Sequence, residues 1–180
     1  MIKVPLGYFC TYICAANHGR KEVNEKAFKE MKARTLTKSD QVKKTQAEVN
    51  KYIHQRDYGL GCISCDEHLR AIHIGGVYDA GHYRSRGSAP HLRFVITQIH
   101  LQCKKCNRQL SGNIVEYRKG FIRRYGVDLV ERIESDQRSR KYTIEQMQRM
   151  AALFRRRSRH FIKVREKYGE EKAKRTRCKV

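Results

Sequence analysis

Cys62-Ile63-Ser64-Cys65 and its counterpart Cys103-Lys104-Lys105-Cys106 decide how this chain folds. Each stretch holds two cysteines separated by two residues, so that together they supply four thiolates. That number and spacing suit one tetrahedral Zn²⁺ ion, and a zinc bound by four thiolates has no open position for a substrate. The sequence therefore predicts a structural zinc site that joins two distant segments of the chain.

Three polar residues accompany these motifs. Asp79-Ala80-Gly81-His82 lies between them, and Asn107 directly follows the last cysteine. A neutral imidazole can accept a proton from water near neutral pH, whereas carboxylate and amide oxygens suit Mg²⁺ or Mn²⁺. We therefore take His82 as a candidate general base, and Asp79 and Asn107 as candidate ligands of a catalytic divalent ion. His100 is either a further ligand of that ion or a packed core residue.

The composition indicates a polyanionic partner. The chain has 40 Lys and Arg residues against 18 Asp and Glu residues, a formal net charge of +22 in 180 residues. Such an excess is typical of proteins that bind nucleic acid. A non-catalytic basic protein would have the same charge, so the charge predicts binding and not cleavage. The candidate phosphate contacts are Arg84, Arg86, Arg93, Lys104, Lys105, Arg155, Arg156 and Arg157.

The cysteines also bear on the cellular compartment. The first residues contain no apolar run suited to a signal peptide, and no segment of the sequence is apolar enough to span a bilayer. We therefore expect a reducing, cytosolic location, where paired cysteines bind metal rather than form disulfides. Cys10 and Cys14, with His18 nearby, are either an incomplete ligand set or ordinary thiols, and Cys178 is an incidental thiol.

The apolar pattern predicts an α+β protein in three parts. Residues 1–57 form a basic helical arm, with an exposed helix over about 20–34 and an amphipathic helix that begins at Ser39 or Asp40 and ends near Tyr58. Residues 58–126 form the metal-bound core, and residues 127–180 form a basic helical region.

Within the core, Ile72 to Tyr78 predicts a hairpin with Gly75-Gly76 in its turn, and Leu92 to Ile96 predicts a returning extended segment. After the second cysteine pair, Ser111 is the expected cap of a helix that Gly126 ends. The order of elements is therefore cysteine pair, hairpin, loop, cysteine pair and helix, which is a treble-clef arrangement.

The C-terminal part predicts two helices. The first covers Asp128 to Glu134, and Thr143-Ile144-Glu145-Gln146 is a capping box that opens a longer one. The apolar stripe of the longer helix predicts core packing, its later turns are strongly basic to Lys167, and the chain from Gly169 is expected to fray.

Several segments also resemble known families. The two Cys-x-x-Cys motifs with Asp79 to Tyr83 and Asn107 resemble HNH (ββα-metal) endonucleases, which are built on a treble clef. Over about residues 52–155 the chain resembles the lambdoid phage NinG (Rap) recombination protein family. The segments that carry this second resemblance are Asp79–Arg84, Ala89–Phe94, Ile99–Cys103, Leu110–Val115, Glu131–Ser135 and Tyr142–Glu145.

The resemblance implies a structure-specific endonuclease that cuts branched recombination DNA, such as D-loops and Holliday-type junctions, in the cytoplasm of a host bacterium. It implies His82 as the general base and Asn107 as a metal ligand. HNH motifs place the acidic ligand directly before the histidine, whereas Asp79 stands three residues away, so His100 is the alternative ligand. Gln98 occupies the position of the central asparagine, which normally braces the loop.

Two further functions compete with this prediction. A zinc-stabilised, non-catalytic nucleic-acid-binding accessory protein fits the charge and the cysteines equally well. An accessory factor that acts through protein contacts would use the apolar stripe of the 143–154 helix. Symmetric cutting of a four-way junction requires two active sites, so a homodimer is expected for the nuclease, and no membrane contact is expected for any of the three.

Overall fold

A computed structural model of the chain describes residues 2–4, 7–9, 11–34, 37–66 and 76–177. The fold is α+β, and the chain divides into two compact units, Met1–Asp40 and Gln41–Val180. The first unit holds strands β1 (Ile2–Val4) and β2 (Gly7–Phe9), which pair antiparallel, and helix α1 (Tyr12–Arg34). The exposed helix expected over 20–34 is therefore part of a longer helix, in which Cys14 is exposed, while Cys10 and Cys178 lie outside the described residues.

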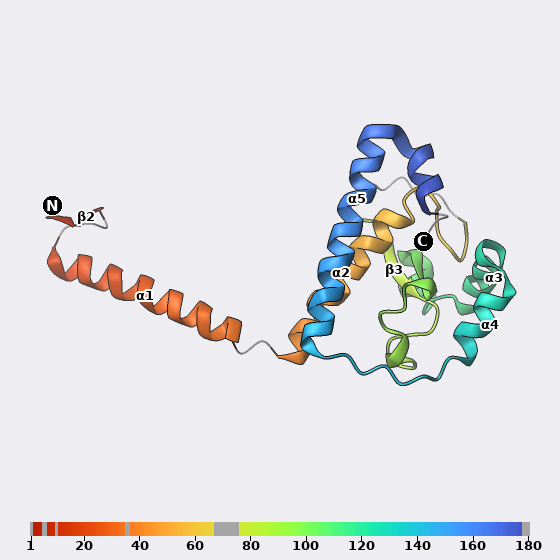
Figure 1. Cartoon of the computed structure of the whole chain (residues 1–180), viewed down its shortest axis with the longest axis horizontal. Coiled ribbons are helices and arrows are strands. Elements are labelled where there is room, and N and C mark those ends of the chain that lie inside the picture. Colours follow the sequence, from red (N-terminus) through yellow and green to blue (C-terminus); the bar gives the residue numbers. More distant parts are fainter. Residues whose placement is uncertain (1, 5–6, 10, 35–36, 67–75, 178–180) are drawn as a thin grey trace. The chain divides into compact units, whose positions relative to one another are not determined.

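A short two-stranded sheet lies within the second unit (Figure 1). Strand β3 (Tyr78–His82) pairs antiparallel with β4 (Ile99–Cys103), so that His82 stands opposite Ile99 and Tyr78 opposite Cys103. Every residue of β4 is buried. The sheet therefore runs from the candidate base at one end to a zinc-motif cysteine at the other.

The loop between these strands differs from the prediction. It contains two 3-10 turns, η1 (Pro90–Leu92) and η2 (Ile96–Gln98), so the extended segment expected over Leu92–Ile96 is wrong. The physical reason is that Leu92 and Phe94 belong to different apolar clusters, which a straight strand could not reach together. The hairpin expected over Ile72–Tyr78 lies mostly outside the described residues, since 67–75 are not among them.

Helices α2 (Lys38–Arg56) and α5 (Ile144–Arg177) pack against each other beside the sheet (Figure 1). The rings of Tyr52 and Phe154 have centroids 5.2 Å apart, and Thr45 Oγ1 donates a hydrogen bond to the carbonyl oxygen of Met147 at 3.1 Å. The predicted apolar stripe of α5 is thus confirmed as core packing. The helix expected as the last part of an N-terminal arm is, as α2, part of the core.

A second apolar cluster is built on helices α3 (Ile114–Tyr125) and α4 (Val127–Ser135). Its centre includes the fully buried rings of Tyr117 and Phe121 and the side chain of Ile63, a residue of the first cysteine motif. A Cβ at Gly120 would overlap the carbonyl oxygen of Ile63. Glycine at this position therefore allows α3 to lie directly against the first cysteine pair.

The helix ends test the predicted caps. The capping box of α5 is confirmed, because Gln146 N–H donates to Thr143 Oγ1 at 3.1 Å and Thr143 N–H donates to Gln146 Oε1 at 2.9 Å. The stop of α3 at Gly126 is also confirmed. A break at Gly169 interrupts α5, but the chain is helical again to Arg177 instead of fraying.

Two other predicted caps are wrong. Asp40 N–H donates to Thr37 Oγ1 at 3.1 Å, so Thr37 caps α2 and the helix begins before Ser39. Asn113, not Ser111, precedes α3, and its backbone has a positive φ of 42°. Within the described residues, none of the helices combines the length and the apolar character needed to cross a bilayer.

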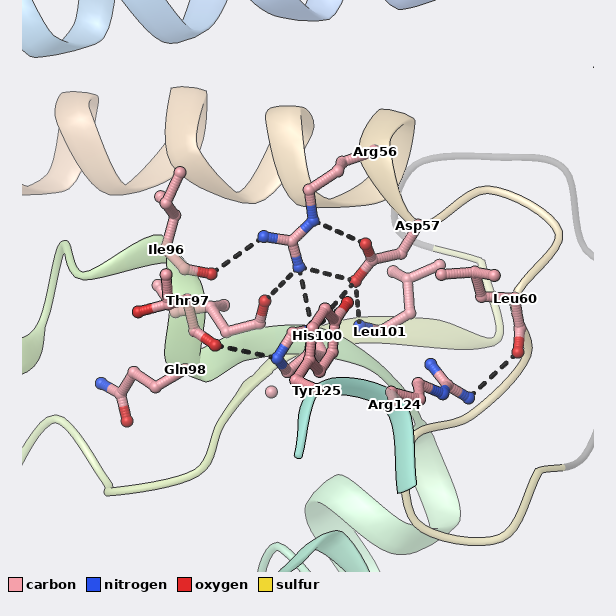
Figure 2. Close-up of polar contacts among 12 residues, drawn as sticks. Arg56, Asp57, Leu60, Ile96, Thr97, Gln98, His100, Leu101, Arg124 and Tyr125 are labelled. Atoms are coloured by element: carbon pink, nitrogen blue, oxygen red, sulfur yellow. Dashed lines mark hydrogen bonds and ion pairs between the residues drawn. The ribbon is translucent and has the colours of Figure 1, made fainter. Parts of the chain in front are cut away.

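A buried ion pair fastens the end of α2 to the sheet (Figure 2). Arg56 donates two hydrogen bonds to the carboxylate of Asp57, at 2.6 and 2.9 Å, and further bonds to the carbonyl oxygens of Ile96 and Ile99 at 2.9 and 2.6 Å. The carboxylate also accepts the N–H of Leu101 at 3.2 Å. Both charges are therefore fully bonded, although Asp57 has only 1% of its side chain exposed.

Replacing Asp57 by Asn should strongly destabilise the fold, because it leaves the buried guanidinium of Arg56 without a counter-charge. We expect a loss of about 3–5 kcal/mol in the free energy of unfolding, measured by urea denaturation at pH 7. Although burial alone would raise the pKa of the Asp57 carboxyl, the adjacent Arg56 and His100 hold it well below its ordinary value.

This pKa direction sets the pH dependence of stability. The folded chain binds the proton of Asp57 less readily than the unfolded chain does, so the stabilisation is complete above pH ~4 and declines as the pH falls further. The exposed Glu131→Gln is the matched control, for which little change is expected. A loss below about 1 kcal/mol for Asp57→Asn would show that the ion pair contributes no more than an exposed one.

Candidate functional site

The four predicted zinc ligands lie together. Their sulfur atoms are all within 4.8 Å of one another, with Cys65 Sγ and Cys103 Sγ 3.9 Å apart. A tetrahedral zinc with Zn–S bonds of about 2.3 Å places its sulfurs about 3.8 Å apart, so this cluster fits one such ion. Backbone N–H groups of Cys103 and Cys106 point at the sulfurs of Cys62 and Cys103, at 3.3 and 3.4 Å. The chain therefore has a group that could hold a metal ion, consistent with structural zinc.

A pocket of about 490 Å³ includes three of the four predicted catalytic residues. Its walls come from α2, from β3, from Arg86 in the loop after β3, and from the π-helical turn η3 (Lys105–Gln109) that contains the last zinc cysteine. The polar and charged residues that line it are Asn50, Lys51, His54, Tyr78, Asp79, His82, Arg86, Asn107 and Arg108. Elements far apart in the sequence thus meet at one cavity.

His82 is held as a neutral imidazole. Its Nε2 atom lies 3.0 Å from the carbonyl oxygen of Arg93, which can only accept, so we assign the proton of the neutral ring to Nε2 and the lone pair to Nδ1. Burial lowers the pKa of His82 to about 4, and the positive charge of Arg86 acts in the same direction. The carbonyl groups of Arg93 and Ala80 act against this shift without overcoming it. His82 is therefore unprotonated throughout the neutral pH range, and its low pKa makes the imidazole a weaker base than an ordinary histidine.

Asp79 and Asn107, the two candidate ligands of a divalent ion, lie side by side. Asn107 Nδ2 donates to Asp79 Oδ2 at 2.9 Å, and Arg108 donates to both carboxylate oxygens at 2.7 and 2.8 Å. Burial would raise the pKa of Asp79, but the bonds from Arg108 and Asn107 lower it below its ordinary value. One carboxylate and one amide suit Mg²⁺, which takes its other ligands from water and phosphate, although a bound ion would compete with Arg108.

The structure explains why no acid directly precedes His82. Gly81 pairs with His100 across the sheet, and a Cβ at position 81 would overlap Oε1 of the diagonal neighbour Gln102 and lie 2.9 Å from Gln102 Cβ. Gln102 in turn donates to Ser64 Oγ at 2.8 Å, so its side chain is committed to the first cysteine motif. The position before the histidine must therefore remain glycine, and the nearest carboxylate in the pocket is that of Asp79.

His100 does not belong to this pocket, which corrects its assignment as a candidate catalytic residue and metal ligand. Its side chain is 1% exposed, and it stands opposite Gly81 instead of His82. Nδ1 accepts a hydrogen bond from Arg56 Nη2 at 2.9 Å, and Nε2 lies 3.0 Å from the carbonyl oxygen of Thr97 (Figure 2). Tyr125 stacks on the ring at 4.8 Å. His100 is thus a packed core residue, which was the alternative prediction for it.

Gln98 braces the loop that carries Arg86 and Arg93. Its Oε1 atom accepts the N–H of Arg84 at 2.8 Å, and its Nε2 atom donates to the carbonyl oxygen of Leu92 at 2.9 Å. The side chain is completely buried, so these bonds are shielded from water. A glutamine therefore joins the two ends of the loop, which is the role expected of an asparagine at this position.

The predicted phosphate contacts are in different surroundings. Arg86 is exposed at the pocket. Burial lowers the pKa of Arg93, and the nearby positive charge of Arg86 lowers it further. Arg84 Nη1 donates a hydrogen bond to the carbonyl oxygen of Glu134 at 3.1 Å. Lys104 and Lys105 lie at the second cysteine pair. On α5, Arg155 contacts Glu48 at 3.4 Å, Arg156 is exposed and Arg157 is near Tyr52.

The sequence interpretation missed the α2 wall of the pocket. Asn50, Lys51 and His54 line the cavity together with Ala47, and these positions follow helical spacing along one face. That spacing could have identified a polar stripe opposite the apolar one. It could not have shown that the stripe faces His82, because the helix and the sheet are separated by residues 57–77.

Replacing Cys103 by Ser should remove bound zinc, since three thiolates no longer complete the tetrahedral set. We expect one Zn²⁺ per parent chain by mass spectrometry and a loss of stability on the order of several kcal/mol when it is removed. Cys14→Ser, in the first unit, is the control and should retain the full metal content. Equal zinc content in the two variants would disprove the four-cysteine site.

The His82 imidazole should titrate near pH 4, well below an ordinary histidine. Histidine-detected NMR titration of the zinc-loaded protein measures this directly. Arg86→Ala should raise the pKa of His82, because it removes a positive charge that disfavours the imidazolium form. A His82 midpoint at or above 6.5 would show that the imidazole is not buried as the structure has it.

Comparison with known proteins places the chain in a family. Residues 9–166 match the family model described as "Bacteriophage Lambda NinG protein". Protein NinG of Salmonella phage P22 is 42% identical over 111 residues, which cover 62% of this chain and 52% of the relative. The corresponding protein of Escherichia phage 933W is 41% identical over 113 residues, covering 63% of this chain and 54% of the relative.

Protein NinG of Escherichia phage lambda is 42% identical over 111 residues, covering 62% of this chain and 52% of the relative. The matched region thus spans about half the length of these curated relatives. No solved structure shows a significant match. Because the family model covers most of the sequence, the chain belongs to the bacteriophage lambda NinG family.

Proposed function

We propose that this protein binds branched recombination DNA and cuts its backbone as a metal-assisted endonuclease. The observation that carries the proposal is the neutral His82 in one pocket with the Asp79–Asn107 pair and the cationic Arg86. A general base, ligands for a hard divalent ion and a cation for phosphate are the components that phosphodiester hydrolysis needs. His82 and Asp79 both lie on β3, whereas Asn107 comes from η3 and Arg86 from the loop after β3, so the pairing of Asn107 with Asp79 is a property of the tertiary structure.

We propose further that the core is a treble-clef HNH unit. The cysteine pairs flank β3 and β4, and α3 follows the second pair. Asn107 directly after the last cysteine, and the loop brace by Gln98, support this assignment. The glycine required at position 81 accounts for the departure from the usual acid–histidine order.

The mechanism follows from the protonation state of His82. Nδ1 accepts a proton from a water molecule, whose oxygen attacks the scissile phosphorus while the bond from phosphorus to the 3′ oxygen breaks. The products are a 5′-phosphate and a 3′-hydroxyl that takes its proton from solvent. A divalent ion held by Asp79 and Asn107 would supply positive charge near the leaving oxygen. Arg86 and Arg93 would bind the phosphate oxygens and so place phosphorus near His82.

Nucleic-acid binding alone is the second candidate function, and it has independent support. The net charge of +22 and the four-cysteine cluster both suit a zinc-stabilised binding protein without any chemistry. The bidentate pair between Arg108 and Asp79 also favours it, because among the described residues that line the pocket the one carboxylate is already neutralised. Binding is thus common to both candidates, and cleavage rests on His82.

Replacing His82 by Ala should reduce cleavage of branched DNA by about 10²–10⁴-fold, because the general base is lost. The measurement is a gel panel of linear, flap, D-loop and four-way DNAs with Mg²⁺ or Mn²⁺ and zinc-loaded protein. Exposed His160→Ala on α5 is the matched control and should cut like the parent. Cleavage by His82→Ala at the parental rate, or no cutting of any substrate by the parent, would leave the binding protein as the function.

A further inference from the structure

One wall of the pocket lies outside the proposed nuclease unit. Ala47, Asn50, Lys51 and His54 of α2 face the cavity, while Val49, Tyr52 and Ile53 on the same helix are fully buried in the core. The two sets occupy opposite sides of α2, as helical spacing requires. This wall stands at the same cavity as His82, and neither the proposed base nor the proposed metal ligands come from it.

The wall is held rigidly against the sheet. Arg56, two residues after His54, donates to the carbonyl oxygens of Ile96 and Ile99, and Asp57 accepts the N–H of Leu101 (Figure 2). Because Ile99 and Leu101 belong to β4, which pairs with β3, these bonds fix the end of α2 relative to the strand that carries His82. The positions of Lys51 and His54 are therefore fixed relative to His82.

The charges around the cavity favour an anion. Lys51, Arg86 and Arg108 are cationic and line the pocket, whereas Asp79 is the only carboxylate in its lining within the part of the chain that the structure describes. Arg108 is paired with Asp79, whereas Arg86 and Lys51, on two different walls, are not paired with the Asp79 carboxylate. Lys51 has one contact with Glu48, at 3.5 Å, and Glu48 is shared with Arg155. Such a contact, half-exposed and long, is readily exchanged for a phosphate.

We propose that Lys51 and His54 bind a backbone phosphate next to the scissile one, so that α2 and the Arg86 loop hold one nucleic-acid strand from two sides. This assignment deepens the proposed nuclease function and rests on it for the identity of the scissile phosphate. The ammonium group of Lys51 supplies charge, and the imidazole N–H of His54 donates a hydrogen bond to a phosphate oxygen. Asn50, beside them, adds an amide donor, and the small side chain of Ala47 leaves room for the strand. The α2 wall thereby selects which bond along the strand reaches His82.

The test measures binding of a fluorescent four-way DNA junction by zinc-loaded protein in the His82→Ala background, so that no substrate is consumed. Lys51→Ala should weaken binding by about tenfold at moderate salt and reduce the slope of log K against log salt by about 0.9, the loss of one phosphate contact. Lys43→Ala is the matched control. It removes the same charge from an exposed position of α2 that does not line the pocket, and it should change the affinity less than about twofold.

A second arm identifies the phosphate. Single methylphosphonate substitutions in the junction remove one backbone charge at a time, and at one position next to the cleaved bond the Lys51→Ala effect should disappear. His54→Ala should also weaken junction binding, and the same methylphosphonate substitution should abolish that effect. The exposed control His160→Ala should not weaken binding. Equal effects of Lys51→Ala and Lys43→Ala, or an effect that no single substitution abolishes, would overturn the proposal.

These results separate the two proposals. If the parent cuts DNA through His82 but Lys51 and Lys43 behave alike, the nuclease assignment stands and the α2 wall is not a phosphate site. If the parent cuts nothing but the Lys51 effect maps to one phosphate, the binding role of α2 stands and the nuclease assignment fails.

Discussion

Four sulfur atoms within 4.8 Å of one another are the constraint on which the rest of this site depends. Cys103 ends β4 and Cys106 lies in the turn that carries Asn107 and Arg108, so the cluster determines where those two side chains leave the backbone. The first pair is tied to the same strand, because Ile63 N–H donates to the carbonyl oxygen of Leu101 at 2.9 Å. In a chain with 39% hydrophobic residues, a metal ion held by these sulfurs would join the two segments and supply stability that a larger core would otherwise provide.

A second constraint acts from the other side of the sheet. The Arg56–Asp57 pair is buried, which is costly unless every charge is bonded, and here the guanidinium and the carboxylate both find backbone partners on or beside β4. Hydrogen bonds depend on direction, so this ion pair fixes the end of α2 in one position relative to β4. Apolar contacts alone would allow the helix end more freedom. The polar face of α2 is thereby held against the cavity that contains His82.

The pocket combines burial with an excess of positive charge. Both conditions disfavour the imidazolium form of His82 and lower its pKa to about 4. The same excess would attract a phosphodiester, whose negative charge partly offsets the repulsion between Arg86 and Arg93. The low pKa of the imidazole and the attraction expected for an anion thus have a single electrostatic origin.

The sequence by itself indicates the four-cysteine cluster, the neighbourhood of Asp79 and Asn107 and most of the helices, and its net charge of +22 predicts a polyanionic partner. These depend on residue type and short spacing, which the order of residues specifies directly. The strand pairing of β3 with β4, the burial of His100 and the approach of α2 to the pocket were decided only in the tertiary structure. Each depends on long-range packing and hydrogen bonding. Leu92 and Phe94, for example, pack into different apolar clusters, and both ring nitrogens of His100 have hydrogen-bond partners inside the protein. These features arise from contacts between residues far apart in the chain, and such contacts cannot be predicted from the local sequence pattern.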